Sequence, residues 1–165
     1  GLRALRLLPG PAGIGQVEVD MGEPSVFPQI SIPLMELTYS VMPVSMGNPH
    51  CILFCPHPEE IALDVLGPAL EHHPVFPDRT NVEFVAVEGD QLRLRVWERG
   101  SGETLACGTG ACAALAAAHF LGLCPPEVTA LLPGGSLVLS LDTASGHIRM
   151  TGPAVTVFEG EWPGG

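Results

Sequence analysis

Hydrophobic and polar residues alternate along most of this chain. Period-two stretches occur at 15–20, 36–46, 81–88, 91–98, 127–132, 136–142, 147–151 and 154–158. Because successive side chains of a strand point to opposite faces, this alternation is typical of half-buried strands. Gly89-Asp90 lies between two of these stretches and predicts an antiparallel hairpin. The apolar run 50–55 predicts a buried strand, and the proline-interrupted segment 27–33 predicts an edge strand or linker.

Three other stretches predict helices. Residues 110–122 leave no polar side, and a helix that is apolar all round is buried on all sides. Residues 58–73 predict a second helix, which Gly67-Pro68 breaks into two pieces. Residues 2–8 predict a short amphipathic helix that ends at Pro9-Gly10. These patterns predict an α+β fold in which antiparallel strands wrap around one central buried helix.

Composition and charge narrow the class of partner. The 165 residues are 46% hydrophobic, enough for a sizeable core. A formal net charge of −11 without any basic run argues against a nucleic-acid or anionic-membrane partner. The longest apolar run, 111–123, has about 13 residues, whereas a membrane-spanning helix needs about 20. We therefore expect a small molecule or a protein as partner, and no membrane.

The absence of lysine and the number of cysteines restrict the chemistry. Without lysine, the chain cannot form a Schiff base or hold pyridoxal phosphate covalently. Five cysteines, an odd number, and no secretion-signal pattern favour a reducing cytoplasm. Cys51, Cys55 and His57 match no common zinc spacing and supply only three ligands, so both cysteines are predicted to be core residues. We expect no metal and no cofactor.

The segment 97–118 is the strongest candidate for chemistry. A predicted strand ends there in a glycine-rich turn, which leads through Cys107 into the apolar helix. The unpaired N–H groups and the dipole at a helix start favour anions, so Gly108, Thr109 and Gly110 form a candidate anion cradle. The same field lowers the pKa of a thiol, which makes Cys107 a candidate nucleophile or base. The alternative is a buried cysteine beside a helix cap.

Two further positions are candidates because of their location. His50 begins a predicted strand directly after the Gly47-Asn48-Pro49 turn, although a lone histidine there is more often a surface or hydrogen-bonded residue. Glu98 and Arg99 precede the glycine-rich turn, where they are either functional or ordinary strand-end charges.

Five segments together resemble diaminopimelate epimerase. They are VDMGEP (19–24), VSMGNPHC (44–51), FPDRTNVEF (76–84), WERGSGETLACGTGACAA (97–114) and MTGPAV (150–155), in the order and approximate spacing of that family. The resemblance implies two similar domains, each with strands around a central helix, and a ligand cleft between them. We expect residues 1–35 to be a remnant of the first domain and 36–152 to form the second. Residues 153–165 are expected to return to the first domain as a strand.

The resemblance also implies a reaction. Family members interconvert L,L- and meso-diaminopimelate, a precursor of lysine and peptidoglycan, by proton transfer at the α-carbon without a cofactor. Two cysteines act on opposite faces of that carbon. Cys107 matches one of them, and the other, in a Cys-Gly-Asn-Gly-x-Arg segment, is expected just upstream of Gly1. We therefore expect the 165-residue chain alone to be inactive as an epimerase. A cytoplasmic homodimer is expected.

Residue roles carry over onto matching positions. His50 and Glu98 would flank the reacting carbon, orienting the substrate ammonium or assisting proton transfer. Asn48, Asn81 and Arg99 would bind the far end of diaminopimelate, and Glu98 would also contact the substrate. Gly108 and Thr109 would stabilise the charge that builds on its carboxylate.

Two alternatives remain open at this point. Hydroxyproline epimerases and proline racemases share the Cys-Gly-Thr-Gly turn, but a segment like Asp-Arg-Ser-Pro typically precedes their cysteine, where this chain has Gly-Glu-Thr-Leu-Ala. From a different class, the chain could be a non-catalytic module that binds anions.

Overall fold

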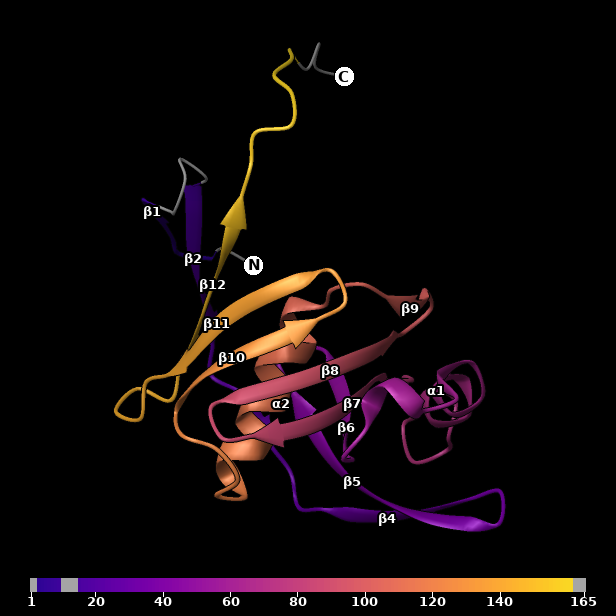
Figure 1. Ribbon diagram of the computed structural model, residues 1–165. Coiled ribbons are helices and arrows are strands. Elements are labelled where there is room, and N and C mark those ends of the chain that lie inside the picture. The colour runs from indigo at the N-terminus through magenta and orange to yellow at the C-terminus, as the bar shows by residue number, and fades with distance from the viewer. Residues whose placement is uncertain (1–2, 10–14, 162–165) are drawn as a thin grey trace.

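The computed structural model describes residues 3–9 and 15–161 (Figure 1). Within these ranges the strands are β1 (Leu5–Leu8), β2 (Gly15–Gly22), β3 (Ser25–Val26), β4 (Ile30–Leu34), β5 (Leu37–Ser45), β6 (Pro49–Phe54), β7 (Asn81–Glu88), β8 (Gln91–Glu98), β9 (Gly102–Thr104), β10 (Glu127–Leu132), β11 (Gly135–Leu141) and β12 (Ile148–Ala154). The helices are the short 3-10 helix η2 (Pro58–Glu60), α1 (Leu63–Glu71) and α2 (Gly108–Phe120). The fold is therefore α+β and dominated by its sheet.

The described strands form one continuous sheet. Its order is β1-β2-β12-β11-β10-β8-β7-β6-β5-β3, with β4 paired to β5 and β9 paired to β8. Most pairings are antiparallel, as the alternation predicted, but β6 pairs with β7 in parallel and so does β10 with β8. Parallel neighbours need a long crossover, and the segments that carry α1 and α2 provide the two crossovers. The expectation of antiparallel strands therefore holds for most pairings but not for these two.

Helix α2 lies inside the curve of this sheet, which confirms the central buried helix. It contacts β3, β5, β6, β7, β8, β11 and β12, and Figure 1 shows it behind β8 and β10. Its residues 111–118 are all buried. Small side chains, mostly alanine, let the strands approach the helix closely from several sides. The prediction that this helix is buried on all sides fails only in its last turn, where Phe120 is 65% exposed.

The opposite face of β6 and β7 packs against α1. Alternation along β6 sends Ile52 into the core around α2 and Cys51 and Leu53 into a second core with α1. Cys55 packs against this second core as well, which confirms that Cys51 and Cys55 are core residues on one face. Strands β6 and β7 are thus buried on both faces, by α2 on one and α1 on the other. This packing fixes the positions of the residues at the ends of the two strands.

Two predicted helices differ from the structure. The segment predicted as a helix from residue 2 to 8 is strand β1, because it pairs with β2, and Arg6 binds Glu18 at 3.2 Å; Leu2 and Gly10 lie outside the described residues. In the segment 58–73 the break falls between η2 and α1, whereas Pro68 is inside α1. Pro68 is the sixth of the nine residues of α1, and the helix continues through it although proline has no N–H to donate to the preceding turn.

The C-terminal part contains one described strand where two were predicted. β12 runs through to Ala154 because it pairs with β11 on one side and β2 on the other. Residues 155–161 have no regular secondary structure, and 162–165 lie outside the described residues. None of the described helices is long and apolar enough to span a membrane.

Candidate active site

Three neighbouring strands bring polar side chains to one edge of the sheet. His50 near the start of β6 pairs with Asn81 at the start of β7, and β8 runs antiparallel to β7, so that Glu98 ends at the same edge. Strand alternation directs His50, Glu83 and Glu98 to the face that α2 covers. The N-terminus of α2 begins at this edge, next to these polar groups.

Cys107 is the N-cap residue of α2. Its backbone is extended (φ −140°, ψ 104°), and the Gly110 N–H donates to its Sγ at 3.4 Å. The Thr109 hydroxyl lies 3.6 Å from the same sulfur. Cys107 is 8% exposed, so the sulfur is nearly enclosed yet faces two hydrogen-bond donors. The predicted placement of Cys107, Gly108 and Thr109 at a helix start is thus observed.

Burial raises the pKa of the Cys107 thiol above its ordinary value. Hydrogen bonds from Thr109 and Gly110 lower this pKa, and the carboxylates of Glu83 and Glu98 raise it. The sequence predicted a lowered pKa from the helix field alone, and the direction is the opposite because desolvation of the thiolate outweighs the donors. In this structure the thiol form is therefore favoured at neutral pH.

A chain of hydrogen bonds connects His50 to the thiol. His50 Nδ1 lies 2.7 Å from Glu83 Oε1, and both side chains are fully buried. His50 Nε2 lies 3.2 Å from Asn48 Oδ1, and Asn48 Nδ2 donates to Thr109 Oγ1 at 3.4 Å. His50 is thus not an isolated surface residue, and its ring belongs to the same network as Cys107.

Asn81 links the two strand ends that flank the site. Its Nδ2 donates to the Pro49 carbonyl and its Oδ1 accepts from the Arg99 N–H, both at 2.9 Å. Asn81 is 3% exposed, whereas Glu98 is partly buried and Arg99 is exposed. Both amide ends of Asn81 therefore bind backbone, which fixes where the Arg99 side chain begins.

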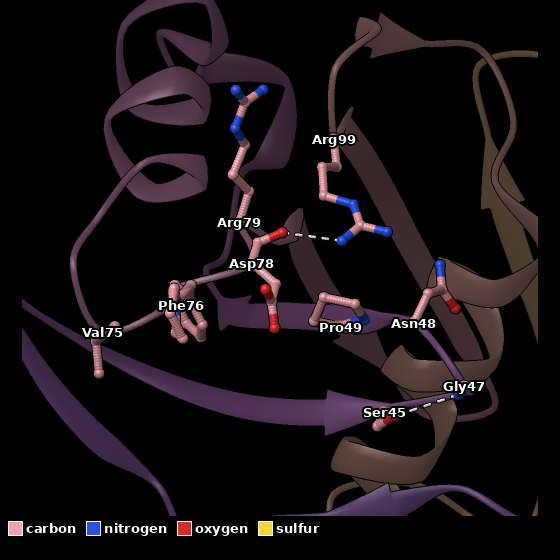
Figure 2. Close-up of a pocket in the computed structure, with 10 residues that line it drawn as sticks. Ser45, Gly47, Asn48, Pro49, Val75, Phe76, Asp78, Arg79 and Arg99 are labelled. Carbon is pink, nitrogen blue, oxygen red and sulfur yellow. Dashed lines mark hydrogen bonds between the residues drawn. The ribbon is translucent and has the colours of Figure 1, made fainter.

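A pocket of about 550 Å³ opens beside Asn48 and Arg99. Figure 2 shows the Arg99 guanidinium pointing toward Asn48 and Pro49, and it donates to the Asp78 carbonyl at 2.9 Å. The remaining lining residues are Ser45, Gly47, Val75, Phe76, Pro77, Asp78 and Arg79. Asn48 both lines this pocket and binds Thr109, so it connects the pocket to the Cys107 side of the site.

Sequence reasoning missed two residues here. Glu83 is fully buried between His50 and the start of α2, where a Cβ on Gly110 would lie 2.6 Å from its Oε1. The available signal was a lone carboxylate within the apolar strand 82–87. Arg79 lines the pocket with a left-handed backbone (φ 60°), which non-glycine residues seldom adopt. No local pattern predicts that conformation.

The described residues contain no cluster of three or more histidine, cysteine or acidic side chains arranged to bind a metal ion. The side chains gathered at this site are suited to acid–base chemistry. It combines one thiol, a helix N-terminus that favours negative charge, and a cationic guanidinium at the nearby pocket.

Comparison of the sequence with known proteins identifies its relatives. The family model described as diaminopimelate epimerase matches residues 42–157. The diaminopimelate epimerase of Thermosynechococcus vestitus is 49% identical, over 90% of this chain and 59% of the relative. That of Desulfovibrio desulfuricans is 43% identical, over 98% of this chain and 63% of the relative. The chain thus spans less than two thirds of the length of these curated relatives.

Solved structures show the same fold at low sequence identity. A predicted epimerase from Pseudomonas aeruginosa is 18% identical with a TM-score of 0.65, over 95% of this chain and 64% of that chain. A hydroxyproline epimerase from Agrobacterium vitis is 17% identical with a TM-score of 0.61, over 92% and 56%. The family match and the curated relatives together show that the chain belongs to the diaminopimelate epimerase family.

Proposed function

We propose that the full-length protein interconverts L,L- and meso-diaminopimelate by cofactor-independent proton transfer at the α-carbon. The observation that carries this proposal is Cys107 as the N-cap of α2, in a chain of this family and beside a pocket that contains Arg99. A thiol can serve as base or acid, and a helix N-terminus stabilises the negative charge that the substrate carboxylate gains.

In this proposal each turnover moves one proton off the α-carbon and one onto it. A thiolate on one face takes the α-proton, so that a C–H bond breaks and an S–H bond forms. A thiol on the opposite face delivers its proton to the carbanion and becomes a thiolate. Cys107 is one of these two groups, and the other belongs to a part of the protein outside the printed sequence. The shorter length of this chain relative to its relatives supports that division.

The other site residues take supporting roles. Backbone N–H groups of Gly108 and Thr109 stabilise the enediolate that forms when the proton leaves. His50 and Glu98 flank the reacting centre, and the Glu98 carboxylate orients the substrate ammonium. Arg99, with Asn48 and Asn81, binds the far end of diaminopimelate, because a guanidinium can bind a carboxylate with two parallel hydrogen bonds.

The organisation of the whole protein is part of the proposal. Residues 1–35 belong to a first domain, 36–152 form the second, and 153–165 return to the first. β2, which lies within residues 1–35, pairs with β12 from Ile148 to Ala154, so the C-terminal strand lies beside the first 35 residues. The protein is proposed to act as a homodimer in the cytoplasm, in the route to lysine and peptidoglycan precursors.

The test is deuterium incorporation at the α-carbon of L,L-diaminopimelate in D₂O, using reduced full-length protein of verified mass. We expect incorporation with inversion, and loss of both in Cys107→Ala, because one of the two bases is gone. Wild-type turnover by Cys107→Ala would remove that residue from the mechanism. The 165-residue chain of 17.3 kDa, assayed in parallel, is expected to be inactive.

Two alternatives are separated by the same experiment. Exchange on hydroxyproline or proline but not on diaminopimelate would assign the protein to the related ring-substrate epimerases. Absence of exchange on every substrate would favour a non-catalytic anion-binding protein. The Arg99 guanidinium at the pocket favours a substrate with a distal carboxylate, which proline and hydroxyproline lack.

A further inference from the structure

Glu83 is a buried carboxylate that the proposed mechanism does not use. It lies on β7 among apolar side chains and is fully buried. Oε1 contacts His50 Nδ1, but Oε2 has no hydrogen-bond partner among the described residues. Burial raises the pKa of this carboxyl, and His50 lowers it by less. A polar group buried this deeply costs stability, so a purely structural role would be served better by an apolar residue.

The contacts of His50 determine where its ring protons are. Nε2 faces Asn48 Oδ1, and because a carbonyl oxygen only accepts, this contact is a hydrogen bond when Nε2 carries the proton. Nδ1 and Glu83 Oε1 lie 2.7 Å apart and share one further proton. That proton belongs either to an imidazolium that donates to a carboxylate or to a carboxylic acid that donates to Nδ1. In both states the shared proton occupies the Nδ1 side of the ring and leaves the proton on Nε2 in place.

The direction of the remaining hydrogen bonds follows from that proton. With Oδ1 accepting from His50, the Asn48 amide presents its Nδ2 to Thr109 Oγ1. Since Oγ1 accepts this bond, the hydroxyl proton of Thr109 is free to donate to Cys107 Sγ at 3.6 Å. The sulfur then faces this O–H and the Gly110 N–H, and both stabilise a thiolate.

We propose that Glu83 is a positioning residue, which keeps a proton on His50 Nε2. Through the Asn48 amide, that proton turns the Thr109 hydroxyl toward Cys107. Glu83 thereby acts on the reactive sulfur without touching it or the substrate. This inference rests on the proposed function, in which Cys107 works as an acid and base.

The charge of Glu83 and the hydrogen-bond chain that it supports act on the pKa of Cys107 in opposite directions. The sign of the pKa change on replacing Glu83 therefore distinguishes the two effects. The charged groups that influence Cys107 are Glu83 on β7 and Glu98 on β8, and Cys107 in turn raises the pKa of Cys112 on α2. A carboxylate at Glu83 raises the pKa of Cys107, so its removal by charge alone would lower that pKa. Loss of the oriented Thr109 donor would instead raise it.

The experiment measures the thiol of Cys107 in the full-length protein. Iodoacetamide alkylation is followed against pH and assigned to Cys107 by peptide mass spectrometry. In Glu83→Met, which keeps the volume but removes both oxygens, we expect alkylation near pH 8 to slow roughly tenfold, which corresponds to about one pKa unit. In Glu83→Gln the amide N–H can donate to His50 Nδ1, so the rate should stay within about threefold of wild type.

Glu88→Gln provides the matched control, because Glu88 ends the same strand at the surface, where it binds Arg93. Its alkylation profile should equal that of wild type. An unchanged or faster rate in Glu83→Met would overturn the proposal, and so would a Glu83→Gln profile as slow as that of Glu83→Met.

A second measurement does not depend on how well the Glu83 variants fold. Ring ¹⁵N spectra of wild-type protein, assigned to His50 by comparison with His50→Gln, report which ring nitrogen carries a proton. We expect a protonated Nε2, and an unprotonated Nε2 would overturn the proposal. Neither measurement requires turnover, so a failure of this inference is distinguishable from a failure of the epimerase assignment.

Discussion

Cys107 illustrates at the residue scale how burial changes the chemistry that neighbouring residues in the sequence suggest. The helix N-terminus and the donors around the sulfur were predictable from the Cys-Gly-Thr-Gly segment. The degree of enclosure was not, because it depends on β7 and β8 as well as on α2. A thiol held mostly protonated suits a group that has to deliver a proton as well as take one.

Arg99 is the residue at which substrate recognition can be tested separately from chemistry. In Arg99→Lys we expect KM for diaminopimelate to rise roughly 10- to 100-fold with little change in kcat, because a point charge replaces a two-pronged donor. Steady-state kinetics of the full-length protein provide the measurement. Arg93→Lys, on a residue paired with Glu59 and Glu88 outside the pocket, is the control. An unchanged KM would remove Arg99 from the binding site.

At the element scale, Trp97 of β8 makes close contacts with α1. Gly67 lies against the indole of Trp97, and a Cβ at position 67 would collide with the ring. The Trp97 N–H donates to Glu71 at the end of the same helix at 2.7 Å. Glycine in the middle of a helix usually lowers stability, so its presence here follows from packing and not from helix propensity.

Gly67→Ala should therefore destabilise the protein although alanine is the better helix former. We expect the free energy of unfolding to fall by about 1–3 kcal/mol, as overpacking of a core typically costs. Urea unfolding provides the measurement, with Trp97→Leu as second mutation of a double-mutant cycle. The cost of Gly67→Ala should shrink by at least about 1 kcal/mol in that background. An equal cost in both backgrounds would mean that the contact with Trp97 is not the cause.

On the scale of the whole molecule, the core encloses most of the thiols. All five cysteines are free, and burial raises the pKa of each of them, to about 12 for Cys112. A thiol whose pKa is raised on folding contributes its full stability below the ordinary value of 9.0 and loses that contribution as the pH rises toward the folded value. The chain has no lysine and a single tyrosine, so few other side chains titrate there.

We accordingly expect stability to fall with pH above about 9, with each strongly buried thiol contributing about 1.4 kcal/mol per pH unit. Urea midpoints of wild type and Cys112→Ala, compared between pH 7 and 10.5, test this. The two profiles should run parallel below pH 8, and the variant should decline less steeply above pH 9. Parallel profiles over the whole range would show that Cys112 is not protected from ionisation.

The elements that were predicted correctly from the sequence are those whose structure is determined by neighbouring residues. The hairpin of β7 and β8 was predicted with its true boundaries, because alternation and a two-residue turn are both local. The predicted break at Gly67-Pro68 was wrong, because both residues lie inside α1. The helix predicted over 2–8 was also wrong, because residues 5–8 pair with β2 as a strand. Parallel pairing of β6 with β7 was also missed, because no local pattern reveals it.

The strand-rich pattern, the apolar helix that has to be buried and the motif that places Cys107 at its start can all be read from the order of the residues. These follow from periodicity, composition and the backbone chemistry of a helix terminus, all of which are properties of neighbouring residues. The meeting of Glu83 and His50 near that sulfur, and the burial that raises the pKa of Cys107, arise only when the chain has folded. The first requires strands that are distant in the sequence to end at the same edge of the sheet. The second requires water to be excluded where these strands meet α2.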